Sequence, residues 1–191
     1  MLTLNLGLLL FLGLHSLRSL VPGWRAAMIA RYGAGLWKLG YSLLALIGLW
    51  LIVHGYGEAR LTQVDLWPLP RWSRHLAATL MLPAQALLVA AYVPGNRLQR
   101  RLQHPMVLGV QLWALAHLIA NNRPADLMLF GTFLIWAVMN FRSARRRSVA
   151  WTAELPSLPR DLAVLVVGLL AWGLLAFWGH RLLIGVAPFG H

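Results

Sequence analysis

Histidine provides most of the side chains that could do chemistry in the apolar stretches of this sequence. The chain has seven histidines and no cysteine, and no Asp, Glu, Lys or Arg lies deep within an apolar stretch. Imidazole binds zinc, copper and iron, including the iron of haem. The lack of cysteine excludes disulfides, thiolate-bound metals, a cysteine nucleophile and covalent c-type haem. A histidine in hydrocarbon is therefore a functional candidate, and an interhelical hydrogen bond is its structural alternative.

His15 and His117 are expected to lie deepest in the membrane. At 1.5 Å per residue, His15 lies about 20 Å and His117 about 18 Å from the start of its own helix, within a hydrocarbon core about 30 Å thick. His104 cannot share a small site with His117 on one helix, because the residues between them span roughly 20 Å. A partner for either histidine must therefore come from another part of the chain.

Two buried imidazoles from different helices favour haem b as the bound cofactor. A structural zinc site wants four ligands, and a non-haem iron site usually includes a carboxylate, which is absent at this depth. Haem b needs only one or two axial imidazoles within apolar walls. We therefore predict that His15 and His117 are the metal ligands of one haem b.

Two neighbours of these histidines join the predicted cofactor-binding set. Arg18 follows His15 by one helical turn and could bind a haem propionate. Snorkelling of Arg18 to the lipid headgroups is the alternative. Trp113 precedes His117 by one turn and could form a wall of the pocket, although it is also an ordinary residue of a membrane span.

His54 and His104 complete the predicted set, and both lie near the ends of their spans. His104 precedes Pro105, and proline in the first turn is also an ordinary helix start. Asp126 and Asp161 each open a span, which suits the positive end of a helix dipole. The remaining histidines are expected near the outer end of the last span or at interfacial and terminal positions: His180, His75 and His191.

Membrane-spanning helices are the elements that must position these residues. Of the 191 residues, 59% are hydrophobic and 12% charged, whereas a soluble domain carries about 25% charged residues. The apolar residues form long blocks, which predicts an all-α, polytopic membrane helix bundle. No GxxxG pair marks a helix interface. Six spans are expected, of which the fourth and fifth should form a hairpin: residues 2–20, 36–54, 75–93, 105–121, 125–141 and 161–187.

Loop charges predict the orientation of these spans. Of the 17 basic residues, about 12 fall in or beside the first, third and fifth loops. Under the positive-inside rule these loops are cytoplasmic, so both termini lie on the non-cytoplasmic side. The net charge of +12 is therefore attributed to topology and not to nucleic acid. Because the first apolar run lacks a basic residue before it and a cleavage site after it, we expect a retained span rather than a signal peptide.

Several strings of the chain are similar to one family. They are HSLR (15–18), HPMVLGVQLWALAH (104–117), NNRPADLMLFGTFLIWAV (121–138) and GHRLLIGVAP (179–188). Together they resemble the NnrU family of bacterial membrane proteins over nearly the whole chain. The resemblance implies a single NnrU-like transmembrane domain over residues 1–191, a place in the bacterial inner membrane and a link to denitrification.

The same domain is similar to the haem-dependent zeta-carotene isomerase. That similarity implies haem b on two histidines, which match His15 and His117 here. A further histidine of the isomerase has no counterpart in FLIWAVMNF (133–141), so the ligand pair can be shared while the substrate differs. The implied partners are the lipid bilayer, haem, and a hydrophobic polyene or a small gaseous ligand. A redox-gated isomerase, an electron carrier and a nitric oxide responsive switch all remain open.

Two other readings remain alternatives. The string Gln103-His104-Pro105 resembles the Arg-His-Pro motif of the isoprenylcysteine carboxyl methyltransferases, but it lacks the arginine at that position. A membrane methyltransferase would use His104 near bound S-adenosylmethionine. The second alternative is a non-catalytic membrane assembly protein whose histidines only connect helices.

Overall fold

The computed structural model describes residues 1–61, 64–146 and 155–189, and every regular element in these ranges is a helix. The helices group into two compact units. The first comprises Met1–Leu66 and Arg123–Thr132, and the second comprises Trp67–Asn122 and Phe133–His191. The all-helical fold predicted from the composition is confirmed for the described residues.

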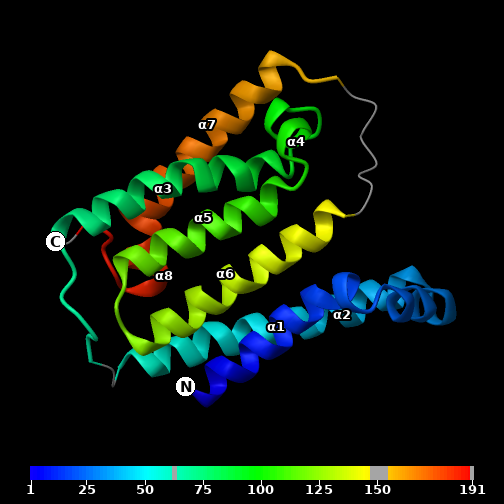
Figure 1. Cartoon of the computed structure of the whole chain (residues 1–191), viewed down its shortest axis with the longest axis horizontal. Coiled ribbons are helices and arrows are strands. Elements are labelled where there is room, and N and C mark those ends of the chain that lie inside the picture. Colours follow the sequence, from blue (N-terminus) through cyan, green and yellow to red (C-terminus); the bar gives the residue numbers. More distant parts are fainter. Residues whose placement is uncertain (62–63, 147–154, 190–191) are drawn as a thin grey trace. The chain divides into compact units, whose positions relative to one another are not determined.

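In the first unit, α1 (Leu2–Leu20) packs along α2 (Pro22–Arg60), and Figure 1 shows the two helices side by side. Only Val21 separates them, and Pro22 starts α2 at a position where a missing N–H costs nothing. Gly55 of α2 lies against the backbone of Leu4, and Gly48 lies against Phe11. The helices are therefore antiparallel, and glycines let their backbones approach closely.

Helix α2 begins much earlier than the predicted span 36–54. It is 39 residues long and bends at Gly33, whose φ is 82° and ψ 156°. This region of backbone space is open to glycine and costly for other residues. The predicted span was too short because polar residues interrupt the apolar block in residues 22–33. This segment is nevertheless helical from Pro22 onward.

The second unit is built around α3 (Arg71–Ala90), which packs against both α5 (Pro105–Ala120) and α7 (Leu158–Leu174), as Figure 1 shows. Gly109 of α5 and Gly168 of α7 both lie against the α3 backbone, at Ala84 and Ala86. The short helix α4 (Arg97–Leu102) precedes α5. Helix α7 runs on through one π-helical turn, η1 (Leu175–Gly179), into α8 (His180–Ile184).

Helix α6 (Pro124–Arg145) contributes residues to both units. Its second half forms the predicted antiparallel hairpin with α5. The Gln111 side chain donates a hydrogen bond to the Ala137 carbonyl at 3.2 Å, and the rings of Trp113 and Phe133 lie 5.3 Å apart. These two contacts agree with the predicted hairpin over the part of it that lies in the second unit.

The predicted helix starts are also confirmed. His104 is the N-cap of α5 with Pro105 in its first turn, and Asp126 and Asp161 lie in the first turns of α6 and α7. His191 and Arg147, by contrast, lie outside the described residues.

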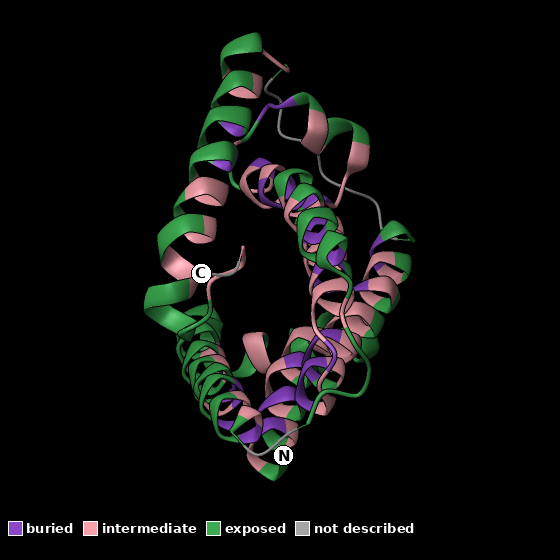
Figure 2. Ribbon diagram, turned by 90° about the vertical axis from the view of Figure 1, so that its left-hand side faces the viewer, coloured by how far each residue is buried: buried purple, intermediate pink, exposed green. Residues whose placement is uncertain are grey.

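Four helices among the described residues are long and apolar enough to cross a membrane: Leu2–Leu20, Pro22–Arg60, Pro124–Arg145 and Leu158–Ile184. Their apolar side chains are widely exposed, and Figure 2 shows buried residues only as short stretches on the ribbons. Exposed apolar faces of this extent suit contact with lipid. Of the other two predicted spans, α5 has 16 residues and α3 begins with Arg71 and Arg74. Six spans and the orientation stay predictions.

Candidate membrane-embedded histidine site

His15 is fixed on α1 by its own helix. Its Nδ1 lies 2.7 Å from the Phe11 carbonyl oxygen. A carbonyl only accepts hydrogen bonds, so Nδ1 carries the proton and the neutral ring has its lone pair on Nε2. The Phe11 ring lies 4.2 Å and the Tyr41 ring 5.5 Å from the imidazole. This arrangement holds the ring in one tautomer and one orientation, as metal-binding histidines require.

A cavity of about 370 Å³ lies beside His15 within the first unit. It forms where the end of α1 faces residues on both sides of the bend in α2. Three cationic side chains line it: Arg18, Arg25 and Lys38. Trp37 and Tyr41 add aromatic walls, so the cavity suits a ligand with a flat apolar body and anionic groups.

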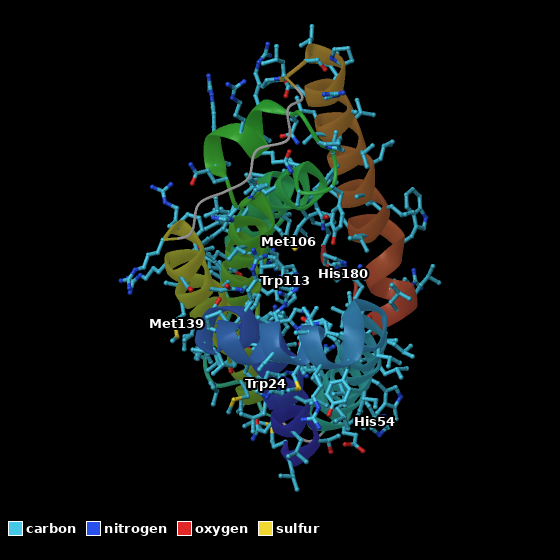
Figure 3. All side chains as sticks on the ribbon, turned by 90° about the vertical axis from the view of Figure 1, so that its right-hand side faces the viewer. Trp24, His54, Met106, Trp113, Met139 and His180 are labelled. Carbon is cyan, nitrogen blue, oxygen red and sulfur yellow. The ribbon has the colours of Figure 1, made fainter. Side chains whose placement is uncertain are left out.

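An adjoining apolar cavity of about 290 Å³ shares Trp37 and Tyr41 with the first. Trp24, which is labelled in Figure 3, lines it, and its ring lies 5.6 Å from that of Trp37. The sequence pointed to Arg18 but not to the other cationic and aromatic walls. Arg25 comes from the part of α2 before Gly33, where no span was predicted, and the early start at Pro22 could have indicated it. Trp37, Lys38 and Tyr41 lie within the predicted span 36–54 but were not singled out.

His117 repeats the local arrangement of His15 on α5. Its Nδ1 lies 2.8 Å from the Trp113 carbonyl oxygen, and the Trp113 ring lies 5.2 Å from the imidazole. The same reasoning places the lone pair on Nε2. The ring of Trp113 therefore lies beside His117 and contacts the ring of Phe133 of α6, while its role as a wall of a haem pocket stays a prediction. His15 belongs to the first unit and His117 to the second.

His180 is the residue that the structure adds to this set. It follows the π-helical turn, and its Nδ1 lies 2.9 Å from the Leu175 carbonyl oxygen five residues earlier. Its ring centre lies 6.1 Å from that of His117, and the two planes differ by 18°. Figure 3 labels His180 and Trp113 on their ribbons. The sequence placed His180 near the end of the last span, and no residue pattern predicted the π turn that orients it.

His54 and His104 have different surroundings from the three anchored histidines. His54 Nε2 lies 3.2 Å from the Glu58 carboxylate, the side chain is 52% exposed, and its ring stacks on Trp50. His54, labelled in Figure 3, does not line the cavity beside His15. The His104 ring meets Phe141 edge-on at the start of α5. Neither residue lines either of the two cavities described above, and both remain predicted cofactor residues.

A buried carboxylate also lies in the first unit. Asp126 is 3% exposed, accepts a hydrogen bond from the Tyr56 hydroxyl at 2.5 Å and accepts another from the Arg123 backbone N–H at 3.1 Å. The Arg123 side chain donates to Asp65 at 2.9 Å, and this hydrogen bond raises the pKa of Arg123. The sequence assigned Asp126 to a helix start, and the structure shows that it also ties α6 to α2.

Among the described residues, no three His, Cys, Asp or Glu side chains gather in a way that could hold a metal ion. Haem places a smaller demand on the protein, because the porphyrin supplies the equatorial nitrogens and the protein supplies one or two axial ligands. His15, His117 and His180 each present an imidazole that is anchored through Nδ1.

Comparison with known proteins identifies the family that the sequence motifs resemble. No curated protein and no solved structure matches the chain. The sequence model described as NnrU protein matches residues 3–188, which is nearly the whole chain. The protein with these anchored histidines and membrane-type helices therefore belongs to the NnrU family.

Proposed function

We propose that this protein is an integral inner-membrane haem b protein in which two histidines hold the iron. The predicted ligands are His15 and His117. One observation carries the proposal: both rings are fixed in the same way, through an Nδ1 contact to the carbonyl four residues earlier and an aromatic ring from that same residue. A fixed tautomer with the lone pair on Nε2 is what an axial imidazole needs.

The residues that line the cavity beside His15 support the proposal on the side of that ligand. Arg18, Arg25 and Lys38 would bind the propionates, because each supplies a cation at the rim of the cavity. Trp37 and Tyr41 would cover the macrocycle with apolar surface. By excluding water, these rings would tune the reduction potential of the iron. The cations would set the orientation in which the cofactor binds.

Haem would supply a redox-active iron, which His15 and His117 would hold. An iron of this kind would serve a redox-gated isomerisation of a hydrophobic polyene, or binding of a small gaseous ligand in a process linked to denitrification. The chain's own contribution is to hold two neutral imidazoles in low dielectric. The two ligands themselves then add no charge to the iron, because a neutral imidazole carries none.

The test is a spectrum of the protein purified in mild detergent after expression with ample haem. We expect a Soret band, its loss in the His15→Ala/His117→Ala double variant, and its retention in His75→Ala. His75 is the matched control because its side chain is exposed on α3, where its ring contacts that of Phe189. A wild-type protein without a Soret band, or a double variant with full haem content, would refute the proposal.

A further inference from the structure

We propose that the two adjoining cavities of the first unit together hold one anionic phospholipid of the surrounding bilayer. The phosphate lies in the cavity beside His15, and one acyl chain lies in the adjoining apolar cavity. The inference goes beyond the proposed haem function and does not depend on it. Because the phosphate uses the cations assigned above to the haem propionates, the lipid is a ligand of the haem-free protein.

The cavity beside His15 has the charge that a phosphodiester requires. Arg18, Arg25 and Lys38 line it, and no Asp or Glu is among the described residues of its wall. In the described part of the chain, none of these three cations forms an ion pair with a carboxylate. Guanidinium and ammonium groups bind phosphate oxygens through charge-assisted hydrogen bonds. Three cations without a carboxylate partner therefore favour an anionic group as the occupant.

The adjoining cavity has the size and character of a site for part of an acyl chain. Its volume is about 290 Å³, and its described walls carry no charged side chain. A water molecule takes up about 30 Å³ of liquid and a methylene group has a similar volume, so the cavity holds roughly ten methylene groups. Trp24 and Tyr32 in its wall are about half exposed, so a chain can enter from the side.

One segment of α2 contributes to both cavities. Trp24, Met28 and Tyr32 are spaced four residues apart, which brings them to one face of the helix, and all three line the apolar cavity. Arg25 and Ile29, each one position further along, line the cationic cavity. The two cavities also share four walls: Leu14, Leu17, Trp37 and Tyr41. A charged compartment and an apolar compartment therefore lie side by side, as a ligand with a charged head and an apolar tail requires.

The position of the cavities favours a bilayer lipid over a soluble phosphate compound. They are built from α1 and α2, which are both long and apolar enough to cross a membrane. Trp24 and Tyr32 are of the residue types that collect at the membrane interface. Basic pockets between membrane helices bind anionic headgroups in this way.

The test is native mass spectrometry of the full chain, prepared free of haem in mild detergent and titrated with lipid. We expect phosphatidylglycerol to bind at least about tenfold more tightly than phosphatidylcholine with the same acyl chains. Arg18→Gln/Arg25→Gln should weaken the binding of phosphatidylglycerol by at least about tenfold. The matched control is Arg142→Gln/Arg145→Gln, which removes two arginines of α6 that line neither cavity and should bind as the wild type does.

A second pair of variants tests the place of the acyl chain. Gly40 lines the apolar cavity, and an added Cβ there meets no atom within 4 Å, so leucine fits and takes up cavity volume. Gly40→Leu should therefore weaken the binding of phosphatidylglycerol. Gly57→Leu is the control, because an added Cβ at Gly57 also meets nothing and Gly57 lines neither cavity.

Equal binding of the two lipids to the wild-type protein would overturn the inference without the use of any variant. Unchanged binding in Arg18→Gln/Arg25→Gln or in Gly40→Leu would overturn it as well. Displacement of the lipid by an equal concentration of inorganic phosphate would show a site for soluble anions instead. Since binding is measured on haem-free protein, absence of a Soret band in the haem experiment would refute the haem function and leave the lipid site standing.

Discussion

Substitution of Gly7 by alanine tests the close approach of α1 and α2. A Cβ atom at Gly7 would lie 2.6 Å from the Ile52 nitrogen and 2.9 Å from Leu51 Cβ. Ordinary contacts of this kind begin at 3.4 Å, so the two backbones would have to separate locally by roughly 0.8 Å. Forcing extra atoms into a packed contact costs about 1–3 kcal/mol.

The matched control is Gly13→Ala on the same helix, where an added Cβ meets nothing within 4 Å. Both substitutions gain helix propensity, worth up to about 1 kcal/mol. This gain cancels in the comparison, so the difference between the variants reports the packing contact alone. We expect Gly7→Ala to be less stable than Gly13→Ala by about 1–3 kcal/mol.

The assay is reversible unfolding in mixed detergent micelles, followed by circular dichroism and tryptophan fluorescence. Gly7→Leu and Gly13→Leu extend the comparison with a larger side chain and should widen the difference. Equal stability of Gly7→Ala and Gly13→Ala, within about 0.5 kcal/mol, would show that the backbones do not approach as the structure describes.

Two further predictions concern the polar contacts of the first unit. Tyr56→Phe should destabilise the protein by about 1–3 kcal/mol, because it removes a hydrogen bond from the buried Asp126 carboxylate; Tyr92→Phe, at a residue 76% exposed, is the control, and equal unfolding midpoints would contradict the contact. Arg123→Gln should cost less than about 1 kcal/mol, because its contact with Asp65 is exposed. Since this contact raises the pKa of Arg123, any stability it contributes is present below the unfolded pKa of arginine and is lost only as the pH rises through the higher folded value. A difference between Arg123→Gln and wild type that changed from pH 6 to pH 9 would contradict this assignment.

The sequence predicted the helices better than it predicted their ends and contacts. Long apolar blocks identify α1, α6 and α7, because burial in lipid requires continuous apolar length. The start of α2 at Pro22 was missed, since residues 22–33 are helical without being uniformly apolar. The interface of α1 and α2 was missed as well. Gly48 and Gly55 lie seven residues apart, which brings them to one face of the helix without forming a GxxxG pair.

The candidate site was predictable only in part, for a physical reason. Depth along a helix follows from residue number, so His15 and His117 could be selected from the sequence. The cavity beside His15 depends on the bend at Gly33, and the proximity of His180 to His117 depends on a π turn. Both features are departures from regular helix, and regular periodicity is what sequence patterns report.

The π turn makes the direction of the His180 side chain depend on the number of residues in the last helix. Removal of one residue from 175–179 would leave the helix apolar and able to cross the membrane, yet it would swing the imidazole of His180 about a quarter of the way around the axis. A family member without the extra residue would need its histidine at a shifted position to meet the partner on α5. Gaps of a single residue in this stretch should therefore accompany displaced histidines when such chains are aligned. The number of residues between Trp172 and His180 can then sort family members by the position of this histidine.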